Sequence, residues 1–304
     1  MTLIQAICAV CGSHDVEEWY PAEIHGLEAV SFRYTFSPDH TRTFRVVRCR
    51  TCSHAFCWPI PKNISEQYRD VVDQEYLSHG ESRRLAAQAV LRIIRRYAPT
   101  GVLLDVGCAT GDFLEVAQAQ GYDVEGIELS SWSSAIARER GLVVHQESLA
   151  TFAATRGARY DVVTLWGVIE HFAEPVAEMR RLRELLRPGG LLVLWTGDVD
   201  SVTSRILGRK WWYWQGQHIQ YFTHASLKHL VTTCSLAHVK THVYPFAATY
   251  ETIANSLRRY QWHSIVTSLL SPLFILKPVW YLRLPGELLF LARRLPECHQ
   301  AHVR

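Results

Sequence analysis

The segment from Leu103 to Leu114 constrains the fold of this chain more than any other. An apolar run ends in an acidic residue, passes through a glycine turn and continues into a helical pattern, in the order Leu-Leu-Asp105-Val-Gly107-Cys-Ala-Thr-Gly111-Asp-Phe-Leu. A strand, turn and helix in this order place backbone N–H groups at the carboxyl edge of a parallel sheet, where ligands bind. Gly107 permits a sharp turn, and Gly111 lets the helix begin close to the strand. The segment therefore predicts an α/β fold with a ligand site at this turn.

The turn differs from two common nucleotide-binding loops. Ala109 breaks the first glycine pair of the dinucleotide fingerprint, and the Gly-Lys-Ser/Thr ending of a P-loop is missing. Asp105 would repel a pyrophosphate, because like charges at short range are unfavourable. The pattern therefore favours a ligand that is cationic or rich in hydroxyl groups.

Further elements follow along the chain at the spacing of repeated strand–helix units. Residues 123–129 read as a second strand ending in Glu128, whose carboxylate can accept hydrogen bonds from both hydroxyls of a ribose. Periodicity and turn residues then predict a strand over 160–166, a helix over 175–186, a stop at Arg187-Pro-Gly-Gly190, a strand over 191–195, a helix over 225–234 and a last antiparallel strand over 287–295.

Taken together, these motifs resemble the class I S-adenosylmethionine-dependent methyltransferases. The acidic residue before the glycine turn, the acidic end of the second strand and the helix followed by Arg-Pro-Gly-Gly carry the resemblance. Ala109 departs from it by replacing the usual middle glycine. The resemblance implies a doubly wound, Rossmann-like sheet of seven strands and S-adenosylmethionine as cofactor. The cofactor-binding positions it implies are Asp105, Gly107, Cys108, Ala109, Gly111, Glu128, Leu129, Glu147, Ser148 and Trp166.

The chain has 304 residues, more than one methyltransferase core needs. We expect a zinc-ribbon module over 1–62, a helical linker or lid over 63–98, and the methyltransferase core over 99–304. An apolar helical insertion is expected within that core at about 247–284, judged from the run of apolar residues there.

Two C-x-x-C pairs, Cys8 with Cys11 and Cys49 with Cys52, predict one structural zinc ion held by four thiolates. Alternating apolar residues between the pairs (Phe32, Tyr34 and Phe36, then Phe44, Val46 and Val47) predict the strands of the ribbon. Two alternatives stay open. One is a redox-active pair, and the other is a site in which Cys57, His14 or His54 replaces one thiolate.

The candidate catalytic residues are His171, His218 and Tyr221. His171 follows the strand over 160–166, at the edge where a methyl group would sit, and is the leading candidate for a general base. The loop over 208–223 is rich in aromatic residues and resembles the His-x-x-Tyr/Phe-Phe-Thr/Ser segment of small-molecule methyltransferases. Its tryptophans could stack on an acceptor or could simply cover the edges of the core. His171 could likewise cap a helix.

The segment over 264–284 is apolar, but Pro272, Lys277 and Pro278 interrupt it. A spanning helix needs about 20 continuous apolar residues, so a lid or a peripheral membrane contact is the better interpretation. The start of the chain does not read as a signal peptide, and Cys108 lies within the cofactor loop, so we expect a reducing, cytoplasmic location.

The sequence best fits a methyltransferase acting on a small molecule, such as a sugar, a glycolipid precursor or a secondary metabolite. One alternative is a nucleic-acid methyltransferase that binds through the ribbon. The net charge of +3 gives no general signal for nucleic acid, and the Asn/Asp-Pro-Pro-aromatic motif is missing after residue 166. Another alternative is a cofactor-binding scaffold without catalytic activity.

Overall fold

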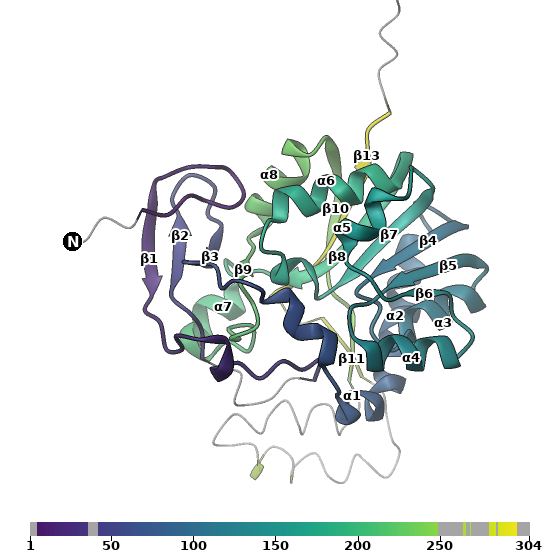
Figure 1. Ribbon diagram of the computed structural model, residues 1–304, viewed down its shortest axis with the longest axis horizontal. Helices are drawn as coiled ribbons and strands as arrows, with labels where there is room; N and C mark the ends of the chain where they lie inside the picture. The colour runs from purple at the N-terminus through teal and green to yellow at the C-terminus, as the bar shows by residue number, and fades with distance from the viewer. Residues whose placement is uncertain are drawn as a thin grey trace, which may run out of the picture.

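The computed structural model describes residues 5–35, 42–248, 280–283 and 285–296, together with residues 264, 265 and 268. At its centre lies a sheet with the strand order β10-β13-β8-β7-β4-β5-β6 (Figure 1). These strands are β4 (Gly101–Val106), β5 (Tyr122–Ile127), β6 (Val144–His145), β7 (Tyr160–Trp166), β8 (Leu186–Gly197), β10 (Leu236–Val243) and β13 (Glu287–Arg294). Strand β13 runs antiparallel to both of its neighbours, β10 and β8, and the other pairings in this sheet are parallel. The predicted seven-stranded sheet and its antiparallel last strand are confirmed.

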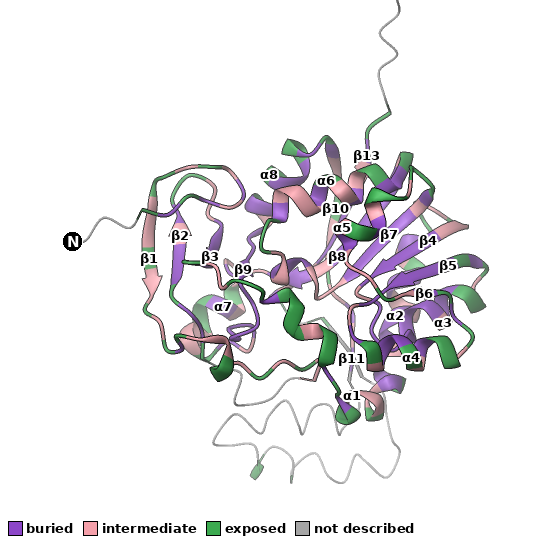
Figure 2. Cartoon of the chain, in the orientation of Figure 1, coloured by how far each residue is buried: buried purple, intermediate pink, exposed green. Residues whose placement is uncertain are grey.

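Helices cover both faces of this sheet (Figure 1). They are α2 (Gly80–Ile94), α3 (Asp112–Ala119) and α4 (Ser131–Glu139) on one face, and α5 (Leu149–Ala154), α6 (Pro175–Leu185) and α8 (His224–Thr233) on the other. Successive strand residues point to opposite faces, so Leu103 packs against α2 and α3 whereas Leu104 packs against α6. The inner strands are therefore buried on both faces (Figure 2).

Several predicted elements match closely. The strand over 160–166 is β7, and α6 ends at Leu185 with Met179 and Leu182 buried, as the helical period predicts. However, β8 begins at Leu186, earlier than the predicted start at residue 191. Its first residues pair irregularly, because Tyr160 faces Leu186 and Val162 then faces Leu191. The Arg-Pro-Gly-Gly segment thus ends the helix and forms the bulged start of the strand.

A second, smaller sheet has the order β1-β2-β3-β9. Its strands β1 (Val16–Tyr20), β2 (Val46–Cys49) and β3 (Ala55–Cys57) come from the N-terminal region, but β9 (Gln220–Tyr221) belongs to the loop after β8. In the pairing of β3 with β9, Ala55 lies opposite Tyr221 and Phe56 opposite Gln220. The small sheet therefore extends beyond the predicted limit at residue 62 and is completed by the methyltransferase part of the chain.

The predicted alternation over residues 32–36 does not form a strand. Phe32 and Tyr34 lie in irregular chain, and Phe36 is outside the described residues. Their rings contact the ring of Tyr68 instead, with centroid distances of 5.5 and 6.4 Å. The alternation of aromatic residues here reflects packing against the helical segment that follows. The prediction of a strand from this alternation was wrong.

The remaining elements are short. They are η1 (Leu27–Ala29), η3 (Ser65–Asp70), α1 (Gln74–Ser78), η4 (Ile169–His171), α7 (Val202–Leu207), η5 (Gly208–Lys210), β11 (Phe246–Ala248) and β12 (Trp280–Leu282). Strands β11 and β12 pair at the two ends of the predicted insertion over about 247–284, most of which lies outside the described residues. In the described part of the chain, no helix has the length and apolar character needed to cross a membrane.

Candidate active site

A cavity of about 680 Å³ lies at the carboxyl edge of the parallel strands. Its walls come from the ends of β4, β5, β7 and β8, the start of β13, the helices α1 and α2, and residues 33–35 of the N-terminal region. The predicted residues that line it are Asp105, Gly107, Cys108, Ala109, Glu128, Leu129, Glu147, Trp166, His171 and His218. Its volume is in the range that small-molecule sites occupy.

The glycine turn forms one wall of this cavity. Gly107 has a φ of +71°, and a Cβ placed on it would lie 2.6 Å from Cγ2 of Val168. Ala109 holds the unfavourable φ of +46°, where the related family has glycine. Gly111 does not line the cavity; it begins α3 in a left-handed conformation, and a Cβ there would collide with Leu142. The turn therefore needs glycine at residue 107 for the backbone path and at residue 111 for packing.

Two buried carboxylates face this wall. Asp105 Oδ1 accepts a hydrogen bond from Thr164 Oγ1 at 2.6 Å, while Oδ2 has no hydrogen-bond partner among the described residues. Burial raises the pKa of Asp105 to about 8. Glu128 accepts from the backbone N–H groups of Ala109 (2.9 Å) and Ser130 (2.8 Å), and burial raises its pKa as well. Buried carboxylates of this kind favour a ligand that brings positive charge or hydroxyl donors.

Several lining residues were not predicted from the sequence as part of the site. They are Tyr34, Tyr68, Tyr76, His79 and Arg83. The hydroxyl of Tyr34 donates to Glu128 Oε1 at 3.1 Å, and the guanidinium of Arg83 lies 3.4 Å from the ring centroid of Tyr76. The tyrosines in the segment before the core could have indicated these lining residues. They precede an amphipathic helix, and this helix had to pack near the glycine turn.

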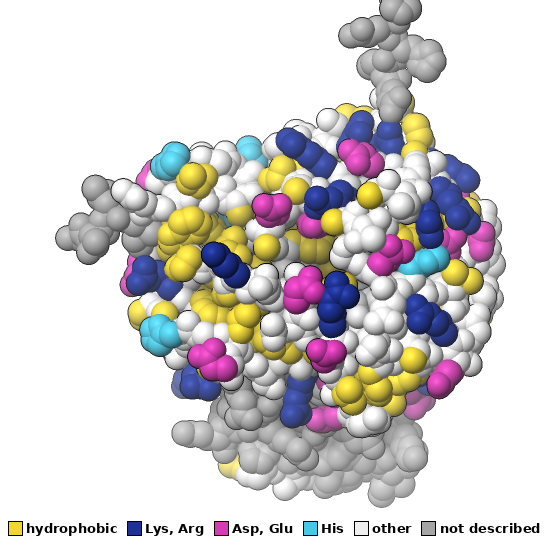
Figure 3. Space-filling view, viewed as in Figure 1, with side chains coloured by type: hydrophobic (Ala, Val, Ile, Leu, Met, Phe, Trp, Pro, Cys, Tyr) yellow, Lys and Arg dark blue, Asp and Glu magenta, His cyan; other side chains and the backbone are white. Residues whose placement is uncertain are grey.

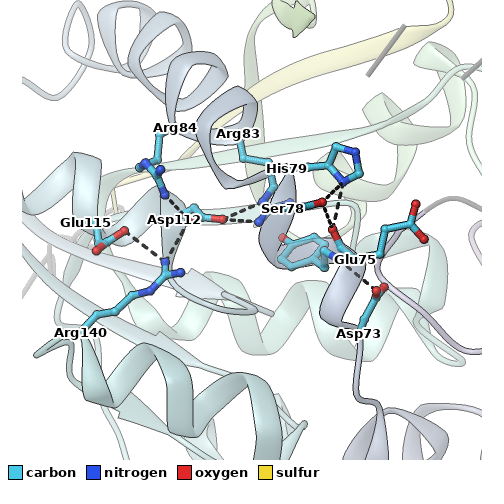
Figure 4. Close-up of polar contacts among 10 residues, drawn as sticks. Asp73, Glu75, Ser78, His79, Arg83, Arg84, Asp112, Glu115 and Arg140 are labelled. Carbon is cyan, nitrogen blue, oxygen red and sulfur yellow. Dashed lines mark hydrogen bonds and ion pairs between the residues drawn. The ribbon is translucent and has the colours of Figure 1, made fainter. Parts of the chain in front are cut away.

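Arg83 is held in place by a charged network at the start of α3 (Figure 4). Its Nε donates to Asp112 Oδ2 at 2.7 Å, while Arg84 and Arg140 reach Oδ1 at 3.1 and 2.9 Å. Asp112 is buried, and its negative charge sits in the first turn of α3, where the helix dipole stabilises it. The network ties α2 to α3 and fixes the position of Arg83 at the cavity.

On the side of β7 and β8, three titratable side chains converge. Glu170, His171 and His218 each offer one nitrogen or oxygen atom, and these atoms lie within 4.8 Å of one another. His171 Nδ1 lies 2.8 Å from the carbonyl of Gln217, and His218 Nδ1 lies 2.8 Å from the carbonyl of Tyr213. Because a carbonyl only accepts, both Nδ1 atoms carry the proton. The same donor set could also hold a divalent cation.

Burial sets the charge of this group. It lowers the pKa of His171 to about 4, so the imidazole is neutral at pH 7 and can accept a proton on Nε2. It raises the pKa of Glu170 to about 7, although hydroxyl groups of Tyr213 and Thr196 donate to the carboxylate. The neutral imidazole therefore has one unprotonated nitrogen at pH 7, and its lowered pKa makes it a weaker base than an ordinary histidine.

Four further candidate residues lie outside the cavity lining. Tyr221 is buried outside the cavity lining, and its hydroxyl donates to the backbone carbonyls of Gln215 and His218. Ser148 caps α5 and does not line the cavity. Trp211 and Trp214 are each 1% exposed and pack in the core between the small sheet and the loop after β8. Tyr221, Trp211 and Trp214 therefore pack in the core, and Ser148 serves as a helix cap.

Strand β9 links the small sheet to the two histidines. His54 Nε2 donates to Gln220 Oε1 at 2.8 Å, and Gln220 Nε2 donates to the carbonyl of Phe172 at 3.0 Å. In addition, the N–H of Ile219 donates to the carbonyl of Glu170 at 3.0 Å. The position of His171 thus depends on the small sheet.

The four predicted metal ligands come together in that sheet. The sulfur atoms of Cys8, Cys11, Cys49 and Cys52 all lie within 4.8 Å of one another. The Cys8–Cys52 and Cys11–Cys49 sulfur pairs are each 3.6 Å apart. Thiolates around a tetrahedral zinc ion are about 3.8 Å apart, given Zn–S bonds of about 2.3 Å. The geometry therefore fits zinc. Cys57 lies in β3, where its Sγ donates to the carbonyl of His218.

Comparison with known proteins agrees with the fold and the cavity. A family described as a methyltransferase domain matches residues 76–239. A ubiquinone biosynthesis O-methyltransferase of Cereibacter sphaeroides is 36% identical over 126 residues, which cover 38% of this chain and 51% of that protein. One from Paraburkholderia phytofirmans is 32% identical over 117 residues, covering 36% and 50%. The chain thus spans about half the length of the curated relatives it matches.

Among solved structures, a SAM dependent methyltransferase from Archaeoglobus fulgidus aligns with a TM-score of 0.52 and 18% identity, over 73% of this chain and 100% of that one. This likeness shows the shared fold. The chain belongs to the methyltransferase domain family. The four cysteines lie outside the matched residues.

Proposed function

We propose that this protein is an S-adenosylmethionine-dependent methyltransferase that acts on a small molecule. The observation that carries the proposal is the pair of buried carboxylates, Asp105 and Glu128, on either side of the glycine turn. Asp105 Oδ2 has no partner among the described residues, so it is available to the cofactor's ammonium group. Glu128 stands at the end of β5, where a carboxylate can accept from both ribose hydroxyls.

The other lining residues complete the cofactor site. Backbone groups of Gly107, Cys108 and Ala109 would contact the cofactor, while Leu129 and Glu147 would lie toward its adenine end and Trp166 toward its methionine end. Arg83 is a cationic side chain fixed at the cavity, and it would pair with the cofactor's carboxylate.

S-adenosylmethionine supplies a methyl group that its sulfonium already activates. The protein then has to hold an acceptor atom in line with this group, exclude water and, for a hydroxyl acceptor, remove a proton. His171 is placed to take that proton on Nε2, with His218 and Glu170 beside it. Donation from Nδ1 to the Gln217 carbonyl holds the ring in the required tautomer.

The acceptor is proposed to be a small hydroxylated molecule, and the cavity supports this class. Its walls include the aromatic side chains of Tyr68, Trp195 and Trp212. The relatives named as ubiquinone biosynthesis O-methyltransferases suggest transfer to oxygen. Against a nucleic-acid substrate, basic and acidic side chains lie interspersed on the face shown in Figure 3.

The direct test supplies methyl-labelled S-adenosylmethionine with hydroxylated rings, with sugars and with nucleic acids in separate reactions. Label transfer to a small hydroxylated acceptor supports the proposal. Transfer only to nucleic acid would favour the alternative in which the ribbon binds the substrate. Cofactor binding without transfer to any acceptor would favour a scaffold.

The pKa of Asp105 makes cofactor binding dependent on pH. The free carboxyl is protonated below about pH 8, whereas a bound ammonium favours its ionised form. At pH 6.5 binding should therefore release close to one proton, and affinity should increase as the pH rises toward about 8. Calorimetry in two buffers of different ionisation enthalpy measures the proton count. Asp105→Asn should abolish the release, and an unchanged enthalpy between buffers in the wild type would contradict the assignment.

We also propose that Cys8, Cys11, Cys49 and Cys52 hold one structural zinc ion. Zinc bound by four thiolates has no open position, so it would stabilise the small sheet and take no part in the reaction. Through β9 it would also support the position of His171.

A further inference from the structure

Glu287 lies at the same edge of the sheet as the proposed active site. It is the first residue of β13, and because β13 runs antiparallel to β8, its first residue lies where the parallel strands end. Along this edge, Asp105 lies in β4 and Glu128 directly follows β5, whereas His171 and Glu287 lie on the side of β7, β8 and β13. Glu287 is therefore on the acceptor side of the cavity.

Aromatic side chains surround this carboxylate. Glu287 Oε1 accepts from Trp212 Nε1 at 2.9 Å, and Oε2 accepts from Trp195 Nε1 at 3.0 Å. The ring of Tyr244 stacks on Trp195 with a centroid distance of 4.8 Å, and its backbone N–H donates to the Glu287 carbonyl at 3.2 Å. We call Glu287, Trp195, Trp212 and Tyr244 the carboxylate cage. All four residues line the cavity.

The charge of the cage has no counterpart in the part of the chain that the structure describes. There, Glu287 forms no ion pair with a lysine, arginine or histidine. Burial raises the pKa of Glu287, and the two indole N–H groups offset this only in part. Glu287 is half-buried, and a carboxylate withdrawn from water is normally paired, whereas Asp105 on the other side of the cavity is already assigned to the cofactor's ammonium group.

We propose that the carboxylate cage binds a cationic amine of the acceptor molecule. This inference rests on the proposed methyltransferase function and narrows its substrate class to hydroxylated amines, such as amino sugars or phenolic amines. Glu287 supplies the opposite charge, and the aromatic faces beside it add cation–π attraction. An ammonium nitrogen has no lone pair, so it is the recognition group, and the methyl group is transferred to a hydroxyl near His171.

The hydrogen bonds from the two indoles would also be explained if Glu287 only fixed the positions of Trp195 and Trp212. A purely structural Glu287 would affect the binding of every acceptor equally, whereas an amine-binding Glu287 would affect the binding of cationic acceptors alone. The test is therefore a comparison between 2-(3,4-dihydroxyphenyl)ethylamine and 2-(3,4-dihydroxyphenyl)ethanol, which differ in the amine. Glucosamine and glucose form a second pair. Dissociation constants are measured by tryptophan fluorescence on the full chain saturated with S-adenosylhomocysteine.

In the wild type, we expect the amine of at least one pair to bind at least about tenfold more tightly than its alcohol. Glu287→Gln should reduce this preference to within about twofold. The new amide would oppose one indole N–H, so a second variant combines Glu287→Gln with Trp212→Phe, which removes that donor and keeps an aromatic face. It should also lose the preference while keeping its melting temperature near that of Trp212→Phe alone.

Three outcomes would overturn the inference: no preference for either amine in the wild type, a preference that survives in both variants, or an equal loss of amine and alcohol binding. If S-adenosylhomocysteine itself fails to bind the wild type, the proposed function fails and this inference falls with it. If S-adenosylhomocysteine binds but neither amine is preferred, this inference is contradicted and the proposed function is not.

Discussion

Replacing His171 by asparagine is expected to lower kcat by about 10²- to 10⁴-fold, which is the usual contribution of a general base. Asparagine can keep the hydrogen bond to the Gln217 carbonyl, but it cannot take the proton from the acceptor hydroxyl. S-adenosylmethionine affinity should change less than about twofold, because His171 lies on the side of β7 and not beside Asp105 or Glu128. Steady-state kinetics and a cofactor titration on the same preparation measure both quantities.

His218→Asn and His229→Asn serve as comparisons. His218 lines the cavity beside His171. If His218→Asn lowers kcat more than His171→Asn does, His218 is the general base. His229 is exposed on α8, and its variant should behave like the wild type. If turnover survives in both His171→Asn and His218→Asn, no histidine acts as the base, and positioning alone must account for the reaction.

Removing one zinc ligand should have the largest effect on stability. Cys49→Ser is expected to lose the metal and to destabilise the small sheet by about 4 kcal/mol or more, since loss of a structural metal is among the most damaging single changes. Turnover should fall with it, because β9 pairs with β3 and holds the backbone at Glu170 and Phe172. Metal analysis, thermal unfolding and kinetics on the full chain test this.

Cys234→Ser is the matched control, because Cys234 is a buried cysteine at the end of α8 and lies outside the cluster of four. It should keep one zinc ion per chain and nearly full activity. Wild-type protein that is free of zinc after purification under reducing conditions would contradict the zinc proposal. A Cys49→Ser protein that retains zinc and a stable small sheet would contradict it as well.

Five strands of the central sheet could be predicted from the sequence because their signals are local, whereas the number of seven strands came from the family resemblance. Apolar runs of strand length, glycine turns and the helix ending at Leu185 each depend on residues close together in the chain. The carboxylates Asp105 and Glu128 could be placed for the same reason, since each is tied to the end of a strand. Once the strand order of the family is assumed, these ends must meet at one edge.

The features that could not be predicted depend on contacts distant in sequence. Pairing of β3 with β9 joins residues separated by more than half the chain, and neither strand indicates its partner. Trp211 and Trp214 gave an aromatic pattern that suits an acceptor pocket, yet the small sheet covers them. Glu287 was predicted only as the start of a strand, and its two indole donors come from β8 and from the loop after η5.

Cofactor binding is tested most directly by calorimetric titration of S-adenosylmethionine into the wild type and Glu128→Ala. The wild type should bind one molecule per chain. Glu128→Ala should lose about 1.5–3 kcal/mol of binding free energy, because a buried carboxylate no longer accepts hydrogen bonds from the ribose. Glu139→Ala, an exposed glutamate on α4, should bind like the wild type. No binding by the wild type, or equal affinity in Glu128→Ala, would contradict the assignment of this protein as an S-adenosylmethionine-dependent methyltransferase.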